Sequence, residues 1–175
     1  MEFDVIIIKG APCAGKSETA KALSIYFPKG VRMEVDNIRS MVISVNWKNQ
    51  KEHINMLQLS ASMVHGFLNF DYKPIIVVDT FSGDKINDFL DILYKLNNDL
   101  SIKIFGLYVS EKELKHRIEF RPDGKFKDFE ICKKINDDVL KLKSENEILI
   151  DTTEQTKEKT AAKIFNMLIH NNPET

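Results

Sequence analysis

Residues 10 to 17 read Gly-Ala-Pro-Cys-Ala-Gly-Lys-Ser and follow the pattern G-x-x-x-x-G-K-[ST]. An apolar run over residues 5–9 precedes the pattern, and a helical stretch follows it. Glycines let a backbone wrap closely around phosphate groups, so successive N–H groups and the start of the next helix can bind anionic oxygens. The pattern therefore predicts a loop that binds the phosphates of a nucleoside triphosphate, with Mg-ATP as the expected ligand. The loop does not distinguish ATP from GTP.

Two side chains of this loop have expected roles of their own. Lys16 would reach the β- and γ-phosphates and act in catalysis, and the Ser17 hydroxyl would ligate Mg²⁺. The other residues are expected to act through their backbone, and the Cys13 thiol is assigned no chemistry. The expected nucleotide-binding residues in this region are Gly10, Ala11, Pro12, Cys13, Ala14, Gly15, Lys16, Ser17 and Glu18.

A second group of candidate residues follows the next expected strand, over residues 31–35, and reads Asp36-Asn37-Ile38-Arg39. A carboxylate at the carboxyl end of a strand beside the phosphate loop can accept a proton from an attacking hydroxyl. Arg39, one turn later, can hold an anionic group of the acceptor. Asp36 is thus the candidate general base, and both residues are candidate acceptor contacts. The alternative is that Asp36 only caps a helix that starts near Asn37, while Arg39 lies in solvent.

A third candidate carboxylate is Asp79, which ends the apolar run over residues 74–78. This is the form of a Walker B strand, and Asp79 could hold Mg²⁺ directly or through a water. The alternative is turn chemistry alone, because many strands end in Asp for that reason. Thr80 is expected to line the same crevice and contact the substrate. The sequence does not decide whether Asp79 or Ser17 alone anchors the metal.

The composition bounds the kind of protein that carries these residues. The chain has 175 residues, with 25 Lys and Arg against 26 Asp and Glu, and a net charge of -1. This length suits one domain over residues 1–175, and the strong basic excess of proteins that coat nucleic acid is missing. No apolar run approaches the roughly twenty residues that cross a bilayer. Cys13 and Cys132 form neither a zinc pattern nor a disulfide framework, so we expect a reduced, soluble, cytoplasmic protein.

The elements that must position these residues alternate between short apolar runs and helical patterns. Strands are expected over residues 5–9, 31–35, 74–78, 102–109 and 147–150. Most of these runs are continuously apolar, which is typical of strands buried on both faces of a parallel sheet. The alternation predicts an α/β doubly wound sheet, whose ligand lies outside the carboxyl ends of the strands.

Helix boundaries also carry sequence signals. The first helix is expected over residues 16–27, because Pro28 disfavours helical geometry in the residue before it. Ser110 followed by Glu113 reads as a capping box, and so does Thr152 followed by Gln155.

On these residues the chain resembles the small P-loop kinases, a group that contains polynucleotide 5′-hydroxyl kinases, zeta-toxin-type kinases and chloramphenicol phosphotransferase. The shared features are the phosphate loop with its Pro12 and the Asp-x-x-Arg element from Asp36 to Arg39. The resemblance implies a three-layer P-loop NTPase fold with a five-stranded parallel sheet in the order 2-3-1-4-5, helices on both faces and a small helical lid. It also implies Asp36 as general base and Arg39 as a contact to the acceptor.

The resemblance extends to a mobile lid over about residues 111–130. Arg117 and Arg121 are four residues apart and share one helical face, and a turn at residues 122–124 ends that helix. Arginines from a lid would neutralise charge on the transferring phosphoryl group, and closure would exclude water. The alternative for Arg117 is an exposed ion pair with Glu113.

The last apolar run ends in Asp151-Thr152-Thr153. In the resembling kinases the loop after this strand lies near the adenine, so Thr152 joins the expected nucleotide-binding residues. The alternative is the capping role described above.

Three functions remain open from the sequence. The first is an ATP-dependent kinase that phosphorylates a hydroxyl of a small molecule, with Asp36 as general base. The second is a polynucleotide 5′-hydroxyl kinase, in which Lys48 and Lys51 beside Trp47 form a small basic stacking patch. The third is a nucleotide-dependent switch or binding module without transfer chemistry. The acceptor and the oligomeric state cannot be read from the sequence.

Overall fold

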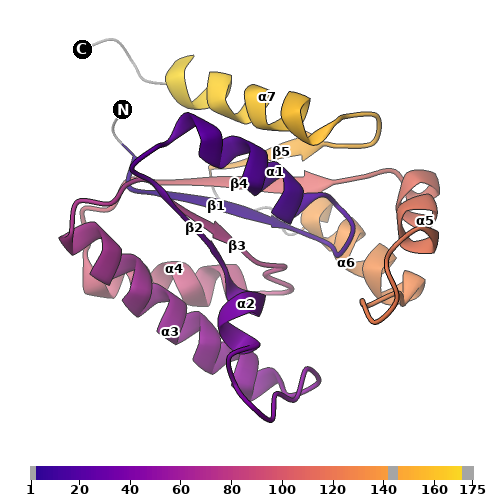
Figure 1. The fold of residues 1–175 in the computed structure, drawn as a ribbon, viewed down its shortest axis with the longest axis horizontal. Coiled ribbons are helices and arrows are strands. Elements are labelled where there is room, and N and C mark those ends of the chain that lie inside the picture. The colour runs from indigo at the N-terminus through magenta and orange to yellow at the C-terminus, as the bar shows by residue number, and fades with distance from the viewer. Residues whose placement is uncertain (1–2, 142–145, 171–175) are drawn as a thin grey trace.

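Five parallel strands form the centre of the structure, a computed structural model that describes residues 3–141 and 146–170 (Figure 1). Their order across the sheet is β2-β3-β1-β4-β5, and every pairing is parallel. The predicted sheet and its strand order are thus confirmed. The strands are β1 (Val5–Gly10), β2 (Val31–Glu34), β3 (Ile75–Val78), β4 (Ile102–Tyr108) and β5 (Glu147–Asp151).

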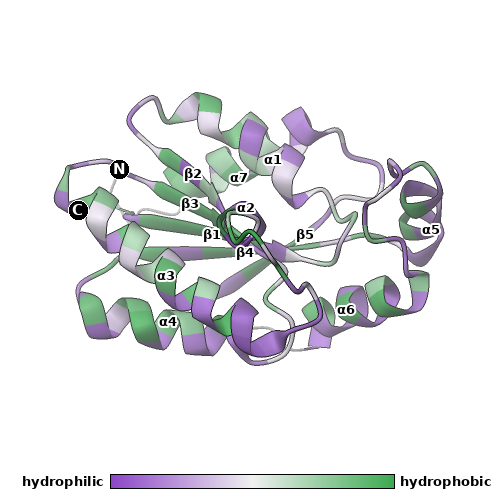
Figure 2. Ribbon diagram, turned by 60° about the horizontal axis from the view of Figure 1, so that its bottom comes forward, coloured by the Kyte–Doolittle hydropathy of each residue, from purple (hydrophilic) through white to green (hydrophobic). Residues whose placement is uncertain are grey.

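Helices cover both faces of this sheet and complete three layers (Figures 1 and 2). The helices α1 and α7 lie on one face, whereas α3, α4 and α6 lie on the other; α5 lies beyond the carboxyl ends of the strands (Figure 1). None of the helices in the described part of the chain is long and apolar enough to cross a membrane. The helices are α1 (Lys16–Leu23), α2 (Val35–Arg39), α3 (Gln50–Asn69), α4 (Lys85–Leu96), α5 (Glu111–Glu119), α6 (Phe129–Lys141) and α7 (Lys157–His170).

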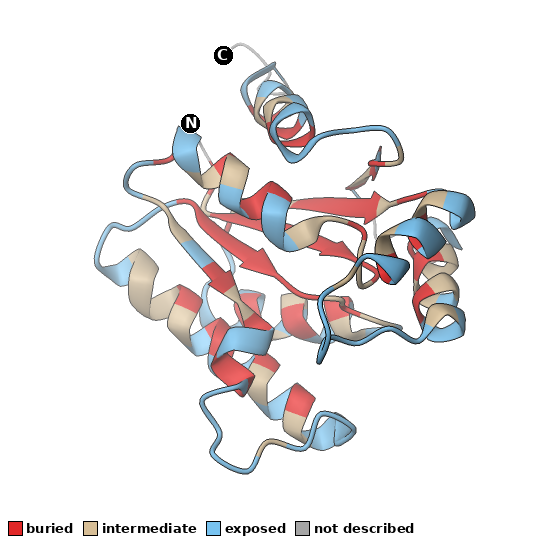
Figure 3. Cartoon of the chain, turned by 45° about the vertical axis from the view of Figure 1, so that its right-hand side comes forward, coloured by how far each residue is buried: buried red, intermediate tan, exposed pale blue. Residues whose placement is uncertain are grey.

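The central strand β1 is buried along its whole length (Figure 3). Ile6 and Ile8 pack in the core beneath α1 and α7, whereas Val5 and Ile7 pack in the core formed with α3 and α4. Alternate side chains of a strand point to opposite faces, so a strand covered on both sides must be apolar at both sets of positions. This explains the continuous apolar run, and it makes β1 a rigid support for the loop that follows it.

One buried ion pair interrupts the apolar core. Lys9 of β1 donates from Nζ to Oε2 of Glu147 at 2.9 Å, with 4% and 0% of the two side chains exposed. The strand register places Lys9 beside Gly106 of β4, and the lysine reaches β5 across this glycine. A Cβ at position 106 would collide with the Glu147 carboxylate. Gly106 is therefore required for a polar link between the strand that carries the phosphate loop and the sheet edge.

Two boundaries near the candidate site differ from the sequence prediction. The α-helix predicted over residues 16–27 ends at Leu23, and the segment Ser24–Tyr26 continues as a 3₁₀ turn before Pro28. The strand predicted over residues 31–35 stops one residue earlier, because Val35 already begins α2. Asp36 therefore lies in the first turn of a helix.

Of the two predicted capping boxes, one cap is present and one is not. Ser110 Oγ accepts a hydrogen bond from the Glu113 N–H at 3.4 Å, as predicted. The cap predicted at Thr152 is wrong, because α7 begins only at Lys157. There Thr156 Oγ1 accepts the hydrogen bond from the backbone N–H of Lys159 at 3.2 Å. Thr152 is left to make other contacts.

Candidate active site

The phosphate loop connects β1 to α1 at the centre of the sheet's carboxyl edge. Gly10 has φ 152°, and a Cβ there would collide with the carbonyl oxygen of Leu107. Gly15, with φ 91°, is the residue just before α1. Cys13 also has a positive φ, 68°. The loop therefore has backbone angles that residues with a side chain rarely adopt, and glycines occupy positions 10 and 15 of it.

Lys16 begins α1 and lies over the loop. Its Nζ donates to the carbonyl oxygen of Ala11 at 2.9 Å. Burial lowers the pKa of Lys16, while the carboxylates of Asp79 and Asp36 oppose this effect and Arg121 adds to it. Four residues predicted for the site, from four separate parts of the sequence, thus lie close enough for their charges to affect one another.

A carboxylate that is not among the residues predicted from the sequence lies against Ser17. The Ser17 hydroxyl donates to Oε2 of Glu34 at 2.7 Å, and Arg32 pairs with the other oxygen of the same carboxylate. Glu34 is the last residue of β2. An acidic residue at a strand end, two positions before the candidate base, is the sequence signal that could have identified it.

These oxygens have the chemistry that Mg²⁺ prefers. Within residues 3–141 and 146–170, no group of three or more His, Cys, Asp or Glu side chains could hold a metal by itself. Mg²⁺ in nucleotide sites usually keeps several waters and takes one or two protein ligands, with the phosphates supplying the rest. Ser17 and Glu34 fit that requirement, with Asp79 nearby.

Asp36 does not cap the helix in which it lies. The residue that precedes α2 is Glu34, the helix begins at Val35, and no side chain caps it. The capping alternative for Asp36 is therefore wrong, and its carboxylate is available to the crevice.

The surroundings of Asp36 alter its acidity. Partial burial and the neighbouring Asp79 carboxylate raise the pKa of Asp36, against the attraction of Lys16, His53 and Arg39. The carboxylate that is proposed to accept a proton thus lies beside a second carboxylate and several cationic or polar groups. Such perturbed titratable groups are enriched at functional sites.

Arg39 is buried, so the alternative that it lies in solvent is wrong. Only 4% of Arg39 is exposed. Its Nε donates to Glu52 at 3.1 Å, and its Nη2 donates to the carbonyls of Asn46 and Asn49 at 2.6 and 3.1 Å. The guanidinium also lies 5.0 Å from the ring centroid of Trp47. Arg39 thereby fixes the otherwise exposed segment between α2 and α3 (Figure 3). Its contact with an acceptor stays a prediction.

Asp79 is buried at the end of β3 and both of its oxygens are engaged. One accepts the backbone N–H of Phe81 at 3.0 Å, and the other lies 3.3 Å from Nε2 of His53. Burial raises the pKa of Asp79, but the His53 hydrogen bond and charge, the Phe81 N–H and Lys16 leave it lowered overall. Turn chemistry is therefore present, and a role in metal binding stays a prediction. His53, from α3, is not predicted from the sequence.

Thr80, the next residue, lines a narrow cavity between the β3–α4 loop and α6. The cavity also contacts Lys9, Ile135 and Asp138. The contact between Thr80 and a substrate stays a prediction.

Arg117 of α5 joins the lid segment to the phosphate loop. It pairs with Glu113 at 2.8 Å, as the alternative suggested, but its guanidinium also reaches the loop. Nη1 donates to the Cys13 carbonyl at 3.3 Å, and Nη2 donates to the Thr152 carbonyl at 2.6 Å. Arg121 instead donates to the carbonyl of Phe126 at 2.6 Å.

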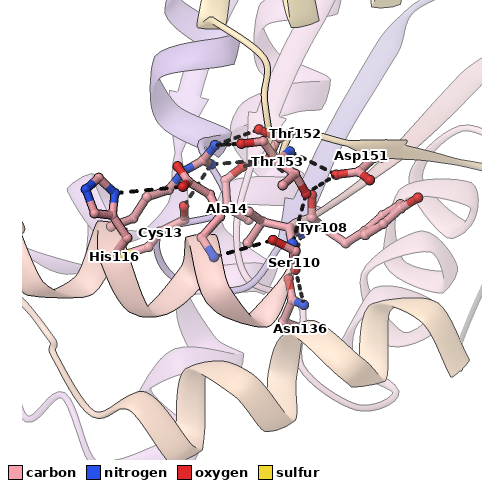
Figure 4. Close-up of polar contacts among 12 residues, drawn as sticks. Cys13, Ala14, Tyr108, Ser110, His116, Asn136, Asp151, Thr152 and Thr153 are labelled. Carbon is pink, nitrogen blue, oxygen red and sulfur yellow. Dashed lines mark hydrogen bonds and ion pairs between the residues drawn. The ribbon is translucent and has the colours of Figure 1, made fainter.

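Thr152 completes this network from the loop after β5 (Figure 4). Its hydroxyl lies 3.1 Å from the carbonyl oxygens of both Ala14 and Tyr108 and accepts from Arg117 Nη1 at 3.2 Å. Thr152 therefore touches the phosphate loop, and its contact with a nucleotide stays a prediction. Glu18, by contrast, forms an exposed ion pair with Lys157 of α7 at 2.7 Å.

Solved structures of kinases share this architecture. The chain is similar to a sugar kinase from Janibacter sp. (TM-score 0.70, 16% identity, covering 97% of this chain and 96% of that one). It is also similar to a gluconokinase from Sinorhizobium meliloti 1021 (TM-score 0.63, 17% identity, 99% and 100% covered). A third similar structure is a chain of the Pnkp1/Rnl/Hen1 RNA repair complex (TM-score 0.67, 20% identity, 83% and 47% covered). The sequence matches no protein-family model and no curated protein. These likenesses establish the three-layer fold of P-loop kinases.

Proposed function

We propose that this protein is an ATP-dependent phosphotransferase that moves the γ-phosphoryl group of Mg-ATP to a hydroxyl of a small-molecule acceptor. The observation that carries the proposal is the parallel order β2-β3-β1, which places Asp36 and Asp79, just after β2 and β3, at the same edge of the sheet as the phosphate loop and Lys16. A loop that only binds nucleotide has no need of a partly exposed carboxylate beside the γ-phosphate position. The sugar kinase and gluconokinase with the same fold act on small molecules.

In the proposed reaction, Asp36 accepts the proton of the acceptor hydroxyl. The hydroxyl oxygen then forms a bond to the γ-phosphorus as the bond to the bridging oxygen breaks, and ADP leaves with the electron pair. Lys16 and the N–H groups of the loop stabilise the charge that spreads over the phosphoryl oxygens. Asp36 must be ionised to act as base. Its raised pKa means that the carboxylate binds a proton more tightly than an ordinary aspartate does, which suits a base that works near neutral pH.

Ser17 and Glu34 are the residues that would hold Mg²⁺, with Asp79 near them. When bound, the ion would neutralise charge on the β- and γ-phosphates. Residues 111–130 would form the lid of a single kinase domain over residues 1–175. In that lid Arg121 would leave the Phe126 carbonyl, to which it now donates, and neutralise the transferring group. Arg117 holds the lid to the loop.

The test is a transfer assay with γ-labelled ATP against hydroxyl-bearing sugars, sugar acids, nucleosides and antibiotics. Asp36→Asn should lower kcat by about 10²- to 10⁴-fold, the usual contribution of a general base. The nucleotide dissociation constant should stay close to that of the wild type. Asp88→Asn, an exposed carboxylate in the first turn of α4, is the matched control. Transfer by Asp36→Asn at the control's rate would exclude Asp36 as the base, and nucleotide binding without transfer to any acceptor would favour a switch or binding module.

A polynucleotide 5′-hydroxyl kinase is the second candidate, because a chain of an RNA repair complex has the same fold. Lys48 and Lys51 are exposed, but the Trp47 ring expected to stack with a base lies against the Arg39 guanidinium. Preference for an oligonucleotide over a nucleoside acceptor, weakening steeply as salt rises, would favour this candidate. Equal use of both acceptors would exclude it.

A further inference from the structure

Lys85 carries a positive charge at the start of α4, where a positive charge is unfavourable. It is the first residue of α4, directly after Asp84, and no side-chain hydrogen bond caps this helix. The positive end of the helix dipole lies at this turn, where acidic side chains are normally stabilising and lysine is not. The position is also half-buried, and burial lowers the pKa of the Lys85 ammonium. The Lys85 charge is therefore expected to lower the stability of the fold.

The partners of Lys85 do not neutralise it. Its Nζ donates to Oε1 of Gln50 at 2.7 Å and to Oγ of Ser82 at 3.3 Å, and both partners are uncharged. Across residues 3–141 and 146–170, no carboxylate lies within ion-pair distance of this ammonium, and neither Asp84 nor Asp88 turns to meet it.

Lys85 lies on the acceptor side of the candidate site. Its partner Gln50 directly follows Asn49, whose carbonyl accepts from Arg39 Nη2 at 3.1 Å, and Arg39 lies in α2 with Asp36. Asp79 also acts on Lys85, but its carboxylate already contacts His53 and accepts the Phe81 N–H, so its negative charge is mainly compensated by these groups. The starts of α3 and α4 meet here through the hydrogen bond between Gln50 and Lys85. The crevice thus contains Asp36 as the candidate base and, apart from it, the Lys85 ammonium.

From this arrangement we propose that the acceptor carries an anionic group, a carboxylate or a phosphate, besides the hydroxyl that is phosphorylated, and that Lys85 binds this group. The inference rests on the proposed phosphotransfer and names the class of its substrate. A compound of this kind would place its hydroxyl at Asp36 and its anion at the ammonium and the positive end of α4. Binding would give Lys85 the ion-pair partner that no carboxylate within residues 3–141 and 146–170 provides.

The test uses pairs of acceptors that differ only in the anion: D-glucose and D-gluconate for the carboxylate, and glycerol and glycerol 3-phosphate for the phosphate. The wild type should use the anionic member of at least one pair with the higher kcat/KM, and that pair identifies the anion. Lys85→Gln should raise the KM for this member about ten- to a hundredfold, the loss expected for one charged hydrogen bond. The KM for ATP and for the neutral member should not change. Lys95→Gln, an exposed lysine at the other end of α4, is the matched control.

A second readout does not depend on turnover. The rate at which acetic anhydride acylates Lys85, followed by mass spectrometry in the presence of Mg-ADP, should fall when the anionic compound is added and not when its neutral counterpart is added. An unchanged acylation rate with both anions, or an unchanged KM in Lys85→Gln, would overturn the inference. Protection of Lys85 without phosphoryl transfer to any acceptor would support the anion site and count against the proposed reaction instead. A melting temperature lowered in Lys85→Gln with no change in KM would mean that Lys85 only ties α4 to α3.

Discussion

Replacing Arg117 by alanine should destabilise the fold and loosen the phosphate loop. The guanidinium is the only side chain of α5 that hydrogen-bonds to this loop among the described residues. It donates to the Thr152 carbonyl at 2.6 Å, to the Thr152 hydroxyl at 3.2 Å and to the Cys13 carbonyl at 3.3 Å. Its ion pair with Glu113 lies at 2.8 Å. A further bond to the Thr153 carbonyl measures 3.4 Å, so removing the side chain leaves three backbone carbonyls without this donor.

The size of the effect follows from these contacts. The short bond to the Thr152 carbonyl is charge-assisted and contributes about 1.5–3 kcal/mol, and the longer bonds contribute less. The Glu113 pair adds only about 0.3–0.5 kcal/mol, because 22% and 31% of the two side chains are exposed. We therefore expect Arg117→Ala to lose about 2–3 kcal/mol of unfolding free energy. For a chain of this length that is a fall of roughly 4–12 °C in Tm.

Urea unfolding and thermal melting, both followed by circular dichroism, measure this loss. Lys115→Ala, an exposed position on the same helix with no ion pair in the structure, is the control and should change stability by less than about 0.5 kcal/mol. Arg117→Lys keeps the charge but lacks the planar fork that reaches Cys13 and Thr152 together, so its loss should be intermediate. An Arg117→Ala protein as stable as the Lys115→Ala control would refute the reasoning.

Three further predictions concern charge, thiol reactivity and packing. Because burial and a like charge raise the pKa of Asp36, Asp36→Asn should be at least as stable as the wild type at pH 7. Wild-type stability should recover as the pH falls through the raised pKa towards the usual aspartate range, which urea titrations at several pH values would show. Burial raises the pKa of Cys132 to about 11, so iodoacetamide at pH 8 should alkylate Cys13 but not Cys132, and Mg-ATP should slow the reaction; mass spectrometry of the peptides checks both. Gly106→Ala should lose about 1–3 kcal/mol in denaturant unfolding, because the added methyl displaces the buried Glu147 carboxylate.

The fold is largely readable from the sequence because its main signals are local. Residues 5–8 are apolar at every position, and a strand needs apolar side chains at successive positions only when both of its faces are buried. The glycines at 10 and 15 then mark a loop whose backbone angles other residues rarely adopt. The boundary after β2 was misplaced by one residue, because Val35 has the strand propensity of its neighbours but packs as the first residue of a helix.

The residues missed in the site depend on contacts that no local pattern encodes. Glu34 meets Ser17 from 17 positions away, and His53 meets Asp79 from 26 positions away. Lys9 and Glu147 are 138 positions apart and pair only because β4 lies between their strands. The fold encloses Arg39 beside Glu52, and its predicted contact with an acceptor stays a prediction. Such pairings depend on which side chains face each other across strands and helices, and these contacts become known only with the structure.

The central claim is that the loop Gly10–Ser17 binds Mg-ATP with Lys16 on its phosphates. Titration calorimetry of the folded protein with ATP and MgCl₂ tests it most directly. The wild type should bind with a dissociation constant of roughly 1 µM to 1 mM, the range usual for enzyme substrates. Lys16→Ala, with an unchanged circular dichroism spectrum, should bind at least about tenfold more weakly, because the ammonium makes charged hydrogen bonds to the phosphates. No heat of binding with either ATP or GTP, or equal affinity in the two proteins, would contradict the account.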